Sequence, residues 1–129
     1  MSSTRPPRPT DAELAILRVL WQRGPSTVRQ VHDELNRAQS TGYTTVLKFL
    51  QIMTEKGLVT RDDSSRTHVY QARRAEDQTQ RQLVRDLLDR AFSGSARKLI
   101  LQALSVKKAS PEELAEIRSL LDQLEREQS

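Results

Sequence analysis

The stretch TGYTTVLKFLQ carries polar side chains whose types and spacing are suited to binding chemistry. On a helix with about 100° per residue, Thr44 and Lys48 lie opposite Val46, with Gln51 and Thr45 on either side. Threonine bonds base edges or phosphates, its methyl packs on the thymine methyl, and lysine reaches phosphate or guanine. The pattern predicts a face that contacts nucleic acid, unless it is simply the polar face of a surface helix.

The other side of the same helix is expected to hold it to its domain. Four apolar residues fall within about 100° of one another on the wheel and form the predicted buried face: Val46, Phe49, Leu50 and Met53. We expect this helix to cover residues 43–56 and to end at Gly57, a common residue after a helix C-terminus. Tyr43 begins the helix, where it either touches phosphate with its hydroxyl or packs.

Two shorter helices precede this one. Thr10 and Glu13 have capping-box spacing, and Leu14 opens a helical apolar pattern that ends at Gly24-Pro25. A second helix begins after Thr27, again with a capping-box partner three residues later. A polar segment over residues 38–42 then predicts a turn, so the three helices form a helix-turn-helix frame.

The pattern changes to short β-prone runs after the third helix. Residues 58–60 and 67–70 are β-prone and flank a polar turn at 62–65, which predicts a hairpin. Arg61 and Arg66 flank that turn, with Thr67 beside the second. These residues either contact a phosphate backbone or minor groove, or keep the hairpin soluble. Three helices followed by a hairpin describe a winged helix-turn-helix, which puts the polar face of the third helix in a DNA groove.

The rest of the chain returns to helical periodicity. Amphipathic helices are expected over residues 76–92 and 96–104, and a third helix begins after Ser110, where Pro follows the cap. A helical core of about 50 residues is thin, so we expect dimerisation rather than packing within one chain. The predicted interface consists of the apolar stripe residues Leu83, Val84, Leu87, Leu88, Ala91, Leu99, Ile100, Leu104, Leu114, Ile117, Leu121 and Leu124.

The net charge of +4 is unevenly distributed along the 129 residues. Residues 1–74 hold 12 Lys and Arg against 7 Asp and Glu, whereas residues 75–129 hold 9 against 10. This asymmetry favours an N-terminal unit that binds a polyanion, although chance variation in solvated charge stays open.

Several chemistries are excluded or disfavoured by the composition. Cysteine is absent, which excludes disulfides, thiolate catalysis and cysteine metal sites. No nucleophile–base set, glycine-rich phosphate loop or metal cluster is evident, so neither an enzyme nor a cofactor is expected. His32 and His68 are isolated and are interpreted as surface or structural residues. No apolar run approaches the roughly 20 residues of a membrane span, which favours a cytoplasmic protein without membrane insertion.

Several segments together resemble the penicillinase-repressor family, the BlaI/MecI-type bacterial regulators. The matching segments are PTDAELAILRVLW, TVRQVHDEL, YTTVLKFLQIMTEKGLV, RTHVYQA, RDLLDRAFSGSARKLILQAL and SPEELAEIRSLLDQLE. The resemblance implies a homodimeric winged-helix repressor that binds a palindromic operator in double-stranded DNA and associates with the bacterial nucleoid. It assigns recognition-helix positions to Thr44, Thr45 and Lys48, and a wing arginine to Arg66.

The resemblance also bears on how repression ends. Antibiotic-responsive members are cleaved in their C-terminal domain after a membrane sensor signals, which implies a sensor-linked protease as a partner and control of β-lactam response genes. The matching positions here are Gln102 and Ala103, which depart from the Asn-Phe pair of the cleaved members and count against cleavage there. The cysteine cluster of copper-responsive members is absent.

The sequence therefore predicts a mainly α protein in three parts. These are a disordered basic tail over residues 1–9, a winged-helix DNA-binding domain over 10–74 and a helical dimerisation domain over 75–129. Two alternatives to an antibiotic-linked repressor stay open: a winged-helix module that binds protein, and a repressor that responds to an unrelated signal.

Overall fold

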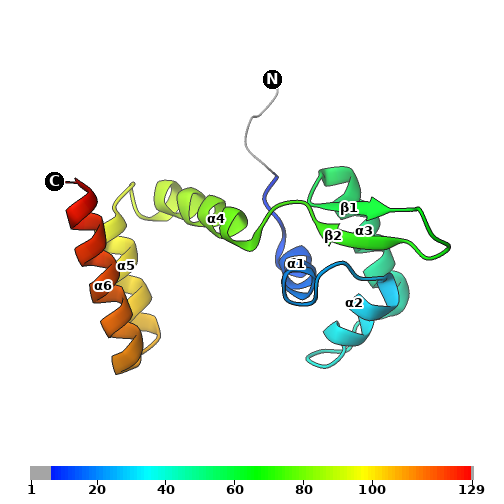
Figure 1. The fold of residues 1–129 in the computed structure, drawn as a ribbon, viewed down its shortest axis with the longest axis horizontal. Coiled ribbons are helices and arrows are strands. Elements are labelled where there is room, and N and C mark those ends of the chain that lie inside the picture. The colour runs from blue at the N-terminus through cyan, green and yellow to red at the C-terminus, as the bar shows by residue number, and fades with distance from the viewer. Residues whose placement is uncertain (1–6, 129) are drawn as a thin grey trace, which may run out of the picture. The chain divides into compact units, whose positions relative to one another are not determined.

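The computed structural model describes residues 7–128, so the first six residues of the predicted tail lie outside the described part. Residues 7–128 form six helices and two strands (Figure 1): α1 (Asp11–Arg23), α2 (Val28–Leu35), α3 (Tyr43–Lys56), β1 (Val59–Asp62), β2 (Val69–Ala72), α4 (Glu76–Ala91), α5 (Ala96–Val106) and α6 (Pro111–Gln128). The mainly α prediction is confirmed. No described helix is long and apolar enough to cross a membrane.

The predicted helix starts are confirmed by their capping hydrogen bonds. The Thr10 hydroxyl accepts from the Glu13 backbone N–H at 3.2 Å, and the Thr10 N–H donates to the Glu13 carboxylate at 2.9 Å. Thr27 and Gln30 make the same reciprocal pair at the start of α2. Each box satisfies backbone donors that a helix start would otherwise leave unpaired.

Gly57 ends α3, as predicted, with a φ of 79° in the left-handed region. Leu58 then donates its backbone N–H to the Met53 carbonyl at 2.9 Å, which completes the closure of the helix end. Because Leu58 is engaged by the helix, the strand starts at Val59.

The hairpin exists, but its predicted bounds are wrong by one to two residues at each end. Val59 pairs with Ala72 and Asp62 pairs with Val69 in an antiparallel register. The predicted second strand began at Thr67, which instead lies in the turn, where its carbonyl accepts from the Ser65 hydroxyl. Ser26 adds a short antiparallel bridge to Tyr70, with N–O distances of 2.8 and 2.9 Å. This bridge ties the hairpin to the start of α2.

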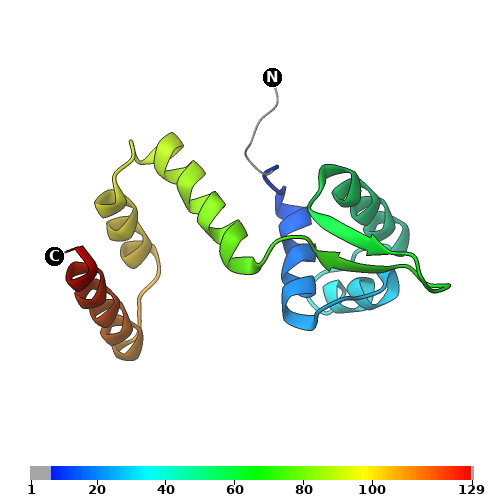
Figure 2. The same cartoon turned by 45° about the horizontal axis from the view of Figure 1, so that its top comes forward.

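One aliphatic core joins the three N-terminal helices and the hairpin (Figure 2). Its fully or nearly fully buried members come from every one of these elements: Ile16, Leu17, Val31, Val46, Leu50, Met53, Val59 and Tyr70. Trp21 is partly buried against this core and donates its indole N–H to the Arg74 carbonyl at 3.0 Å. Phe49 is also partly buried there, so the predicted inner face of α3 is confirmed.

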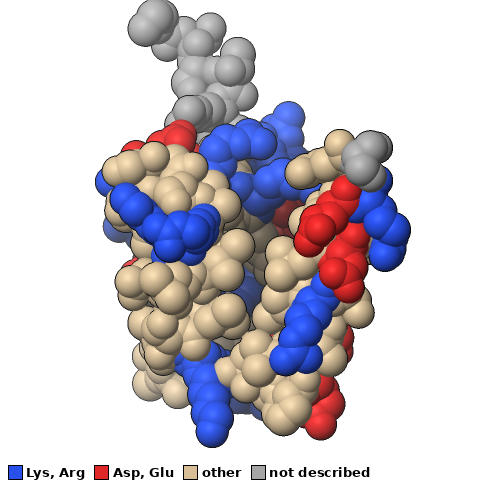
Figure 3. All heavy atoms as spheres, turned by 90° about the vertical axis from the view of Figure 1, so that its left-hand side faces the viewer, with Lys and Arg blue, Asp and Glu red and all other residues tan. Residues whose placement is uncertain are grey.

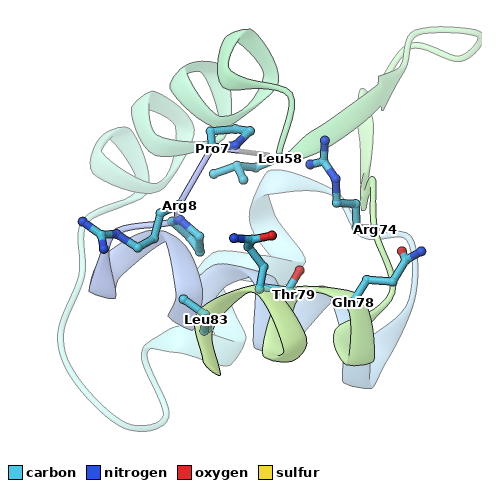
Figure 4. Close-up of a pocket in the computed structure, with 9 residues that line it drawn as sticks. Pro7, Arg8, Leu58, Arg74, Gln78, Thr79 and Leu83 are labelled. Carbon is cyan, nitrogen blue, oxygen red and sulfur yellow. The ribbon is translucent and has the colours of Figure 1, made fainter. Parts of the chain in front are cut away.

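The chain divides into two compact units, a first that runs to Arg85 and a second that begins at Asp86. The first unit reaches into α4 because the start of that helix packs beside the winged-helix elements. A small cavity of about 20 Å³ lies at this seam (Figure 4), and its lining comes from Pro7, Arg8, Pro9, Leu58, Arg74, Gln78, Thr79, Gln82 and Leu83. The functional division at residue 74 stays a prediction, since compactness does not report where DNA binding ends.

Candidate nucleic-acid interface

The outer face of α3 has the composition of a binding surface. Thr44, Thr45, Lys48 and Gln51 are all exposed, whereas Val46 on the opposite face is fully buried. In the described part of the chain, neither Thr44, Thr45 nor Lys48 has a side-chain partner. By contrast, the Thr54 hydroxyl on the same helix donates to the Leu50 carbonyl at 2.8 Å. The two N-terminal threonines and the lysine therefore keep their hydrogen-bonding capacity for a ligand.

The turn before α3 is fixed by one asparagine side chain. Asn36 donates from Nδ2 to the His32 carbonyl at 2.7 Å and to the Thr41 carbonyl at 2.8 Å. Its Oδ1 accepts from the Thr41 backbone N–H at 3.0 Å. Three bonds from one side chain span the connection between α2 and α3, so Asn36 sets the angle at which α3 is presented. Sequence reasoning identified the turn but missed this residue.

Tyr43, at the first turn of α3, is 41% exposed. Two side chains of α2, Arg29 and His32, lie against its ring. The Arg29 guanidinium carbon lies 5.1 Å from the centroid of the Tyr43 ring, within cation–π range. The His32 ring meets the tyrosine edge-on at 5.8 Å. Sequence reasoning missed Arg29, because its approach depends on how α2 crosses α3. The phenol and the guanidinium together form a polar corner suited to a phosphate.

The wing holds its two arginines differently. Arg61 Nε lies 2.8 Å from Asp63 Oδ1, and this carboxylate raises the pKa of the Arg61 guanidinium, with help from Tyr70. The same Asp63 oxygen lies 2.6 Å from His68 Nδ1. Arg66 and Thr67 are exposed, and Arg66 has no ion-pair partner among residues 7–128. Arg66 is therefore the wing arginine whose charge no described carboxylate engages.

A buried carboxylate anchors the far end of α3. The side chain of Glu13 is 3% exposed, and Lys56 Nζ lies 2.7 Å from its Oε1. Burial raises the pKa of Glu13, but the hydrogen bonds from Lys56 and the Thr10 backbone outweigh it and lower the pKa overall. One carboxylate thus caps α1 and holds the last turn of α3. The capping box predicted the first role and gave no sign of the second.

Comparison with known proteins identifies the family of this chain. The profile described as "Penicillinase repressor" matches residues 9–123. The chain belongs to the penicillinase repressor family. It is 34% identical over 116 residues to the transcriptional regulator BlaI of Mycobacterium tuberculosis, covering 89% of this chain and 83% of that protein. It is 24% identical over 117 residues to the penicillinase repressor of Bacillus licheniformis, covering 91% of each.

A solved structure supports the same family and fold. Bacillus licheniformis BlaI, a monomeric form in complex with the blaP half-operator, superposes with a TM-score of 0.50 at 25% identity. The superposition covers 57% of this chain and 89% of that one. The winged-helix prediction is confirmed, and penicillinase repressors regulate transcription, so the chain is no enzyme.

The apolar stripes predicted for dimerisation lie partly or fully exposed on α4, α5 and α6 of this penicillinase repressor, and two of their residues, Leu83 and Val84, belong to the first unit. No described residue of α4, α5 or α6 is buried. On the face drawn in Figure 3, residues other than Lys, Arg, Asp and Glu cover broad areas that charged side chains interrupt. Among the predicted interface residues, the most exposed large side chains are Val84, Leu87, Ile100, Leu104, Leu121 and Leu124; the half-buried ones are Leu83, Leu88, Leu99, Leu114 and Ile117. Gln102 and Ala103 are exposed within α5.

Proposed function

We propose that the chain is a transcriptional repressor that binds a palindromic DNA operator as a homodimer and blocks the promoter. The observation that carries this proposal is the outer face of α3, where Thr44, Thr45 and Lys48 are exposed and unpartnered on a winged-helix scaffold. In such scaffolds the N-terminal half of the second helix of the motif enters the major groove. The B. licheniformis relative in complex with its half-operator supports the same use of the fold here.

The roles of the contacting residues follow from their chemistry. Lys48 and the two threonines are proposed to read base edges, with Gln51 at the border of that face. Tyr43 and Arg66 are proposed to bind phosphates, which set the position of the protein on the duplex without reading sequence. Arg61 and Thr67 are weaker candidates in the wing, because Asp63 already occupies the Arg61 guanidinium.

Dimerisation is proposed to occur through the second unit. The end of α4 and the helices α5 and α6 expose large apolar side chains and, in the described residues, contain no buried one. Contiguous exposed apolar surface of this kind marks a protein interface. A two-fold dimer would cover it and would present two copies of α3 to two half-sites.

The regulated genes and the release step are proposed from the relatives. The name of the B. licheniformis relative, penicillinase repressor, favours genes of the β-lactam response. The sensor-linked protease is proposed only from the family resemblance of the sequence. Cleavage at Gln102–Ala103 would require α5 to open, because a helical backbone does not fit a protease cleft in extended form. Since the second unit lacks a core of its own, local opening is expected to be easy once the dimer separates.

The test is selection of duplexes from a random library by the purified full chain, followed by anisotropy titration of the enriched sequence. The expected result is a palindromic motif that is bound with steep salt dependence, because lysine and arginine contacts release counterions. Enrichment without a motif, or no binding above bulk DNA, would contradict the proposal and favour a protein-binding module.

A further inference from the structure

Large apolar side chains are rare on the surface of the first unit. Among its described residues, only three are exposed: Tyr43 at 41%, Ile52 at 36% and Val84 at 45%. The first two lie on α3, the helix proposed to enter the groove. The remaining large aliphatic residues of α3 are buried or partly buried against the core. The exposure of Ile52 is therefore a property of the recognition helix and not of the domain surface in general.

Ile52 forms one wall of a shallow hollow along the outer side of α3. The hollow measures about 420 Å³ and is lined by Thr45, Lys48, Phe49 and Ile52. These residues are spaced at three or four positions, so they form one ridge of the helix surface. Phe49 is partly buried against the core and provides an apolar floor. The threonine methyl, the lysine stem and the isoleucine surround that floor.

The chemistry of the hollow indicates which chemical group could bind in it. An apolar recess bordered by a lysine suits a group that is apolar itself but attached to a polyanion. In the major groove, the thymine 5-methyl is the one apolar group that a base pair presents. No acidic residue lines the hollow to repel phosphate. A basic excess in residues 1–74 further favours DNA over an apolar protein partner at this face.

We infer that Ile52, together with the Thr45 methyl, reads thymine 5-methyl groups in the bound duplex. The inference rests on the proposed function and names a sequence preference within it. Thr45 and Ile52 lie seven residues apart, which is about 10.5 Å along the helix axis. With about 3.4 Å per base step, the two side chains would reach thymines roughly three steps apart.

Uracil substitution tests this inference, because uracil differs from thymine only by the missing methyl. The duplex enriched from the random library is synthesised with thymine and, in a second version, with uracil at every thymine. The wild-type chain is expected to bind the uracil duplex about four-fold more weakly for each methyl contacted. Ile52→Ala is expected to weaken binding to the thymine duplex and to bring the ratio of the two affinities toward one.

Two further variants separate the contact from general damage. Thr45→Ser keeps the hydroxyl and removes only the methyl, so it should lower the same ratio while binding is retained. Val106→Ala shortens an aliphatic side chain that is 81% exposed on α5, and it should leave the ratio unchanged. Melting curves of all variants confirm that the first unit is folded.

The outcomes that overturn the inference differ from failure of the proposed function. Equal wild-type affinity for the thymine and uracil duplexes would overturn it, and so would an Ile52→Ala variant that loses affinity for both duplexes equally. An Ile52→Ala variant that binds both duplexes like wild type would assign the exposed isoleucine to another partner and would also overturn it. If no duplex is enriched at all, the proposed function itself fails.

Discussion

The two units of the chain make opposite use of their apolar residues. In the first unit, Val31, Val46 and Leu50 are fully buried in a core shared by three helices and the hairpin. In the second unit, Leu101, Leu120 and Leu121 are about half exposed, and no described residue is buried. Both units are rich in leucine, so leucine content alone does not separate them. The difference is that the helices of the first unit cross one another around a common centre.

This contrast indicates which unit can fold without a partner. Burial of a Val, Leu or Ile side chain contributes roughly 1.5–3 kcal/mol to the free energy of unfolding, and the first unit buries many such side chains within one chain. The second unit gains little stability from burial until another surface covers its helices. The first unit is thus expected to fold independently of protein concentration, whereas the second is expected to depend on it.

The largest expected effect comes from opening the core of the first unit. Leu50→Ala leaves a cavity at a site that is fully buried, which costs about 2–5 kcal/mol of unfolding free energy. Urea unfolding followed by tryptophan fluorescence measures this loss, since Trp21 lies against the same core. The midpoint should shift by the same amount at low and high protein concentration, and a concentration-dependent shift would contradict an autonomous first unit.

The matched substitution in the second unit should behave in the opposite way. Leu121→Ala removes the same atoms from a side chain that is 48% exposed, so the stability of the monomer should hardly change. In a two-fold interface the residue occurs twice, and the dimer is expected to weaken by about 3 kcal/mol, roughly 100-fold in its dissociation constant. Sedimentation equilibrium measures the constant. An unchanged value would remove Leu121 from the interface.

The next effect concerns the carboxylate that joins α1 to α3. Glu13→Gln can keep the capping box, as Gln30 does at the start of α2, but it removes the charge that pairs with Lys56, which should cost about 1.5–3 kcal/mol in the first unit. Lys56 is 32% exposed, so the loss is smaller than for a fully buried pair.

The same carboxylate gives a pH dependence with a defined sign. The folded pKa of Glu13 is lowered from its usual value near 4.5. Its contribution to stability is therefore present above about pH 4.5 and is lost as the pH falls through the lower folded pKa. Wild-type unfolding free energy should drop in that window more steeply than that of Glu13→Gln. Parallel curves would contradict the proposed pair.

A smaller effect is expected at the proposed base-reading lysine. Lys48→Ala should weaken operator binding by about 1–2 kcal/mol without changing stability, because the side chain is exposed and unpaired in the described residues. Titrations at several salt concentrations distinguish the two roles of a lysine. Loss confined to the selected sequence indicates base reading, while uniform loss over all duplexes with a shallower salt slope indicates phosphate contact. Unchanged affinity would exclude both.

The smallest expected effect is one additional phosphate contact made by the wing. Asp63→Ala releases Arg61 from a carboxylate 2.8 Å away and leaves it to external phosphates. The salt dependence of DNA binding should steepen by about one phosphate contact. Asp77→Ala is a matched control, since it removes another exposed carboxylate that pairs with an arginine, 3.3 Å from Arg81 Nη2 on α4. An identical slope in both variants would show that the wing arginine does not reach DNA.

The features that the sequence predicted well are those set by local geometry. Helical periodicity correctly separated Val46 from Thr44 and Lys48, because neighbours on a helix follow from backbone geometry alone. The capping boxes at Thr10 and Thr27 were predictable for the same reason, since donor and acceptor lie three residues apart.

The missed features depend on segments that meet only after folding. Arg29 reaches Tyr43 through the crossing of two helices, and Lys56 reaches Glu13 across 43 positions of sequence. The predicted start of the first strand was wrong because the closure of α3 takes the Leu58 backbone N–H, a competition that β-propensity does not contain. The helical wheel could have identified Ile52 as an outward-facing residue, because it falls near Thr45 on the wheel.

Two copies of α3, held together by the second unit, are proposed to bind one palindromic duplex. Native mass spectrometry of the full chain with the enriched duplex, and with a version that keeps one half-site, is the direct test of this dimer. The expected result is two chains on the palindrome and weaker binding to the half-site duplex, with the preference lost in Leu121→Ala. One chain on the palindrome, or equal affinity for both duplexes, would rule out binding as a dimer.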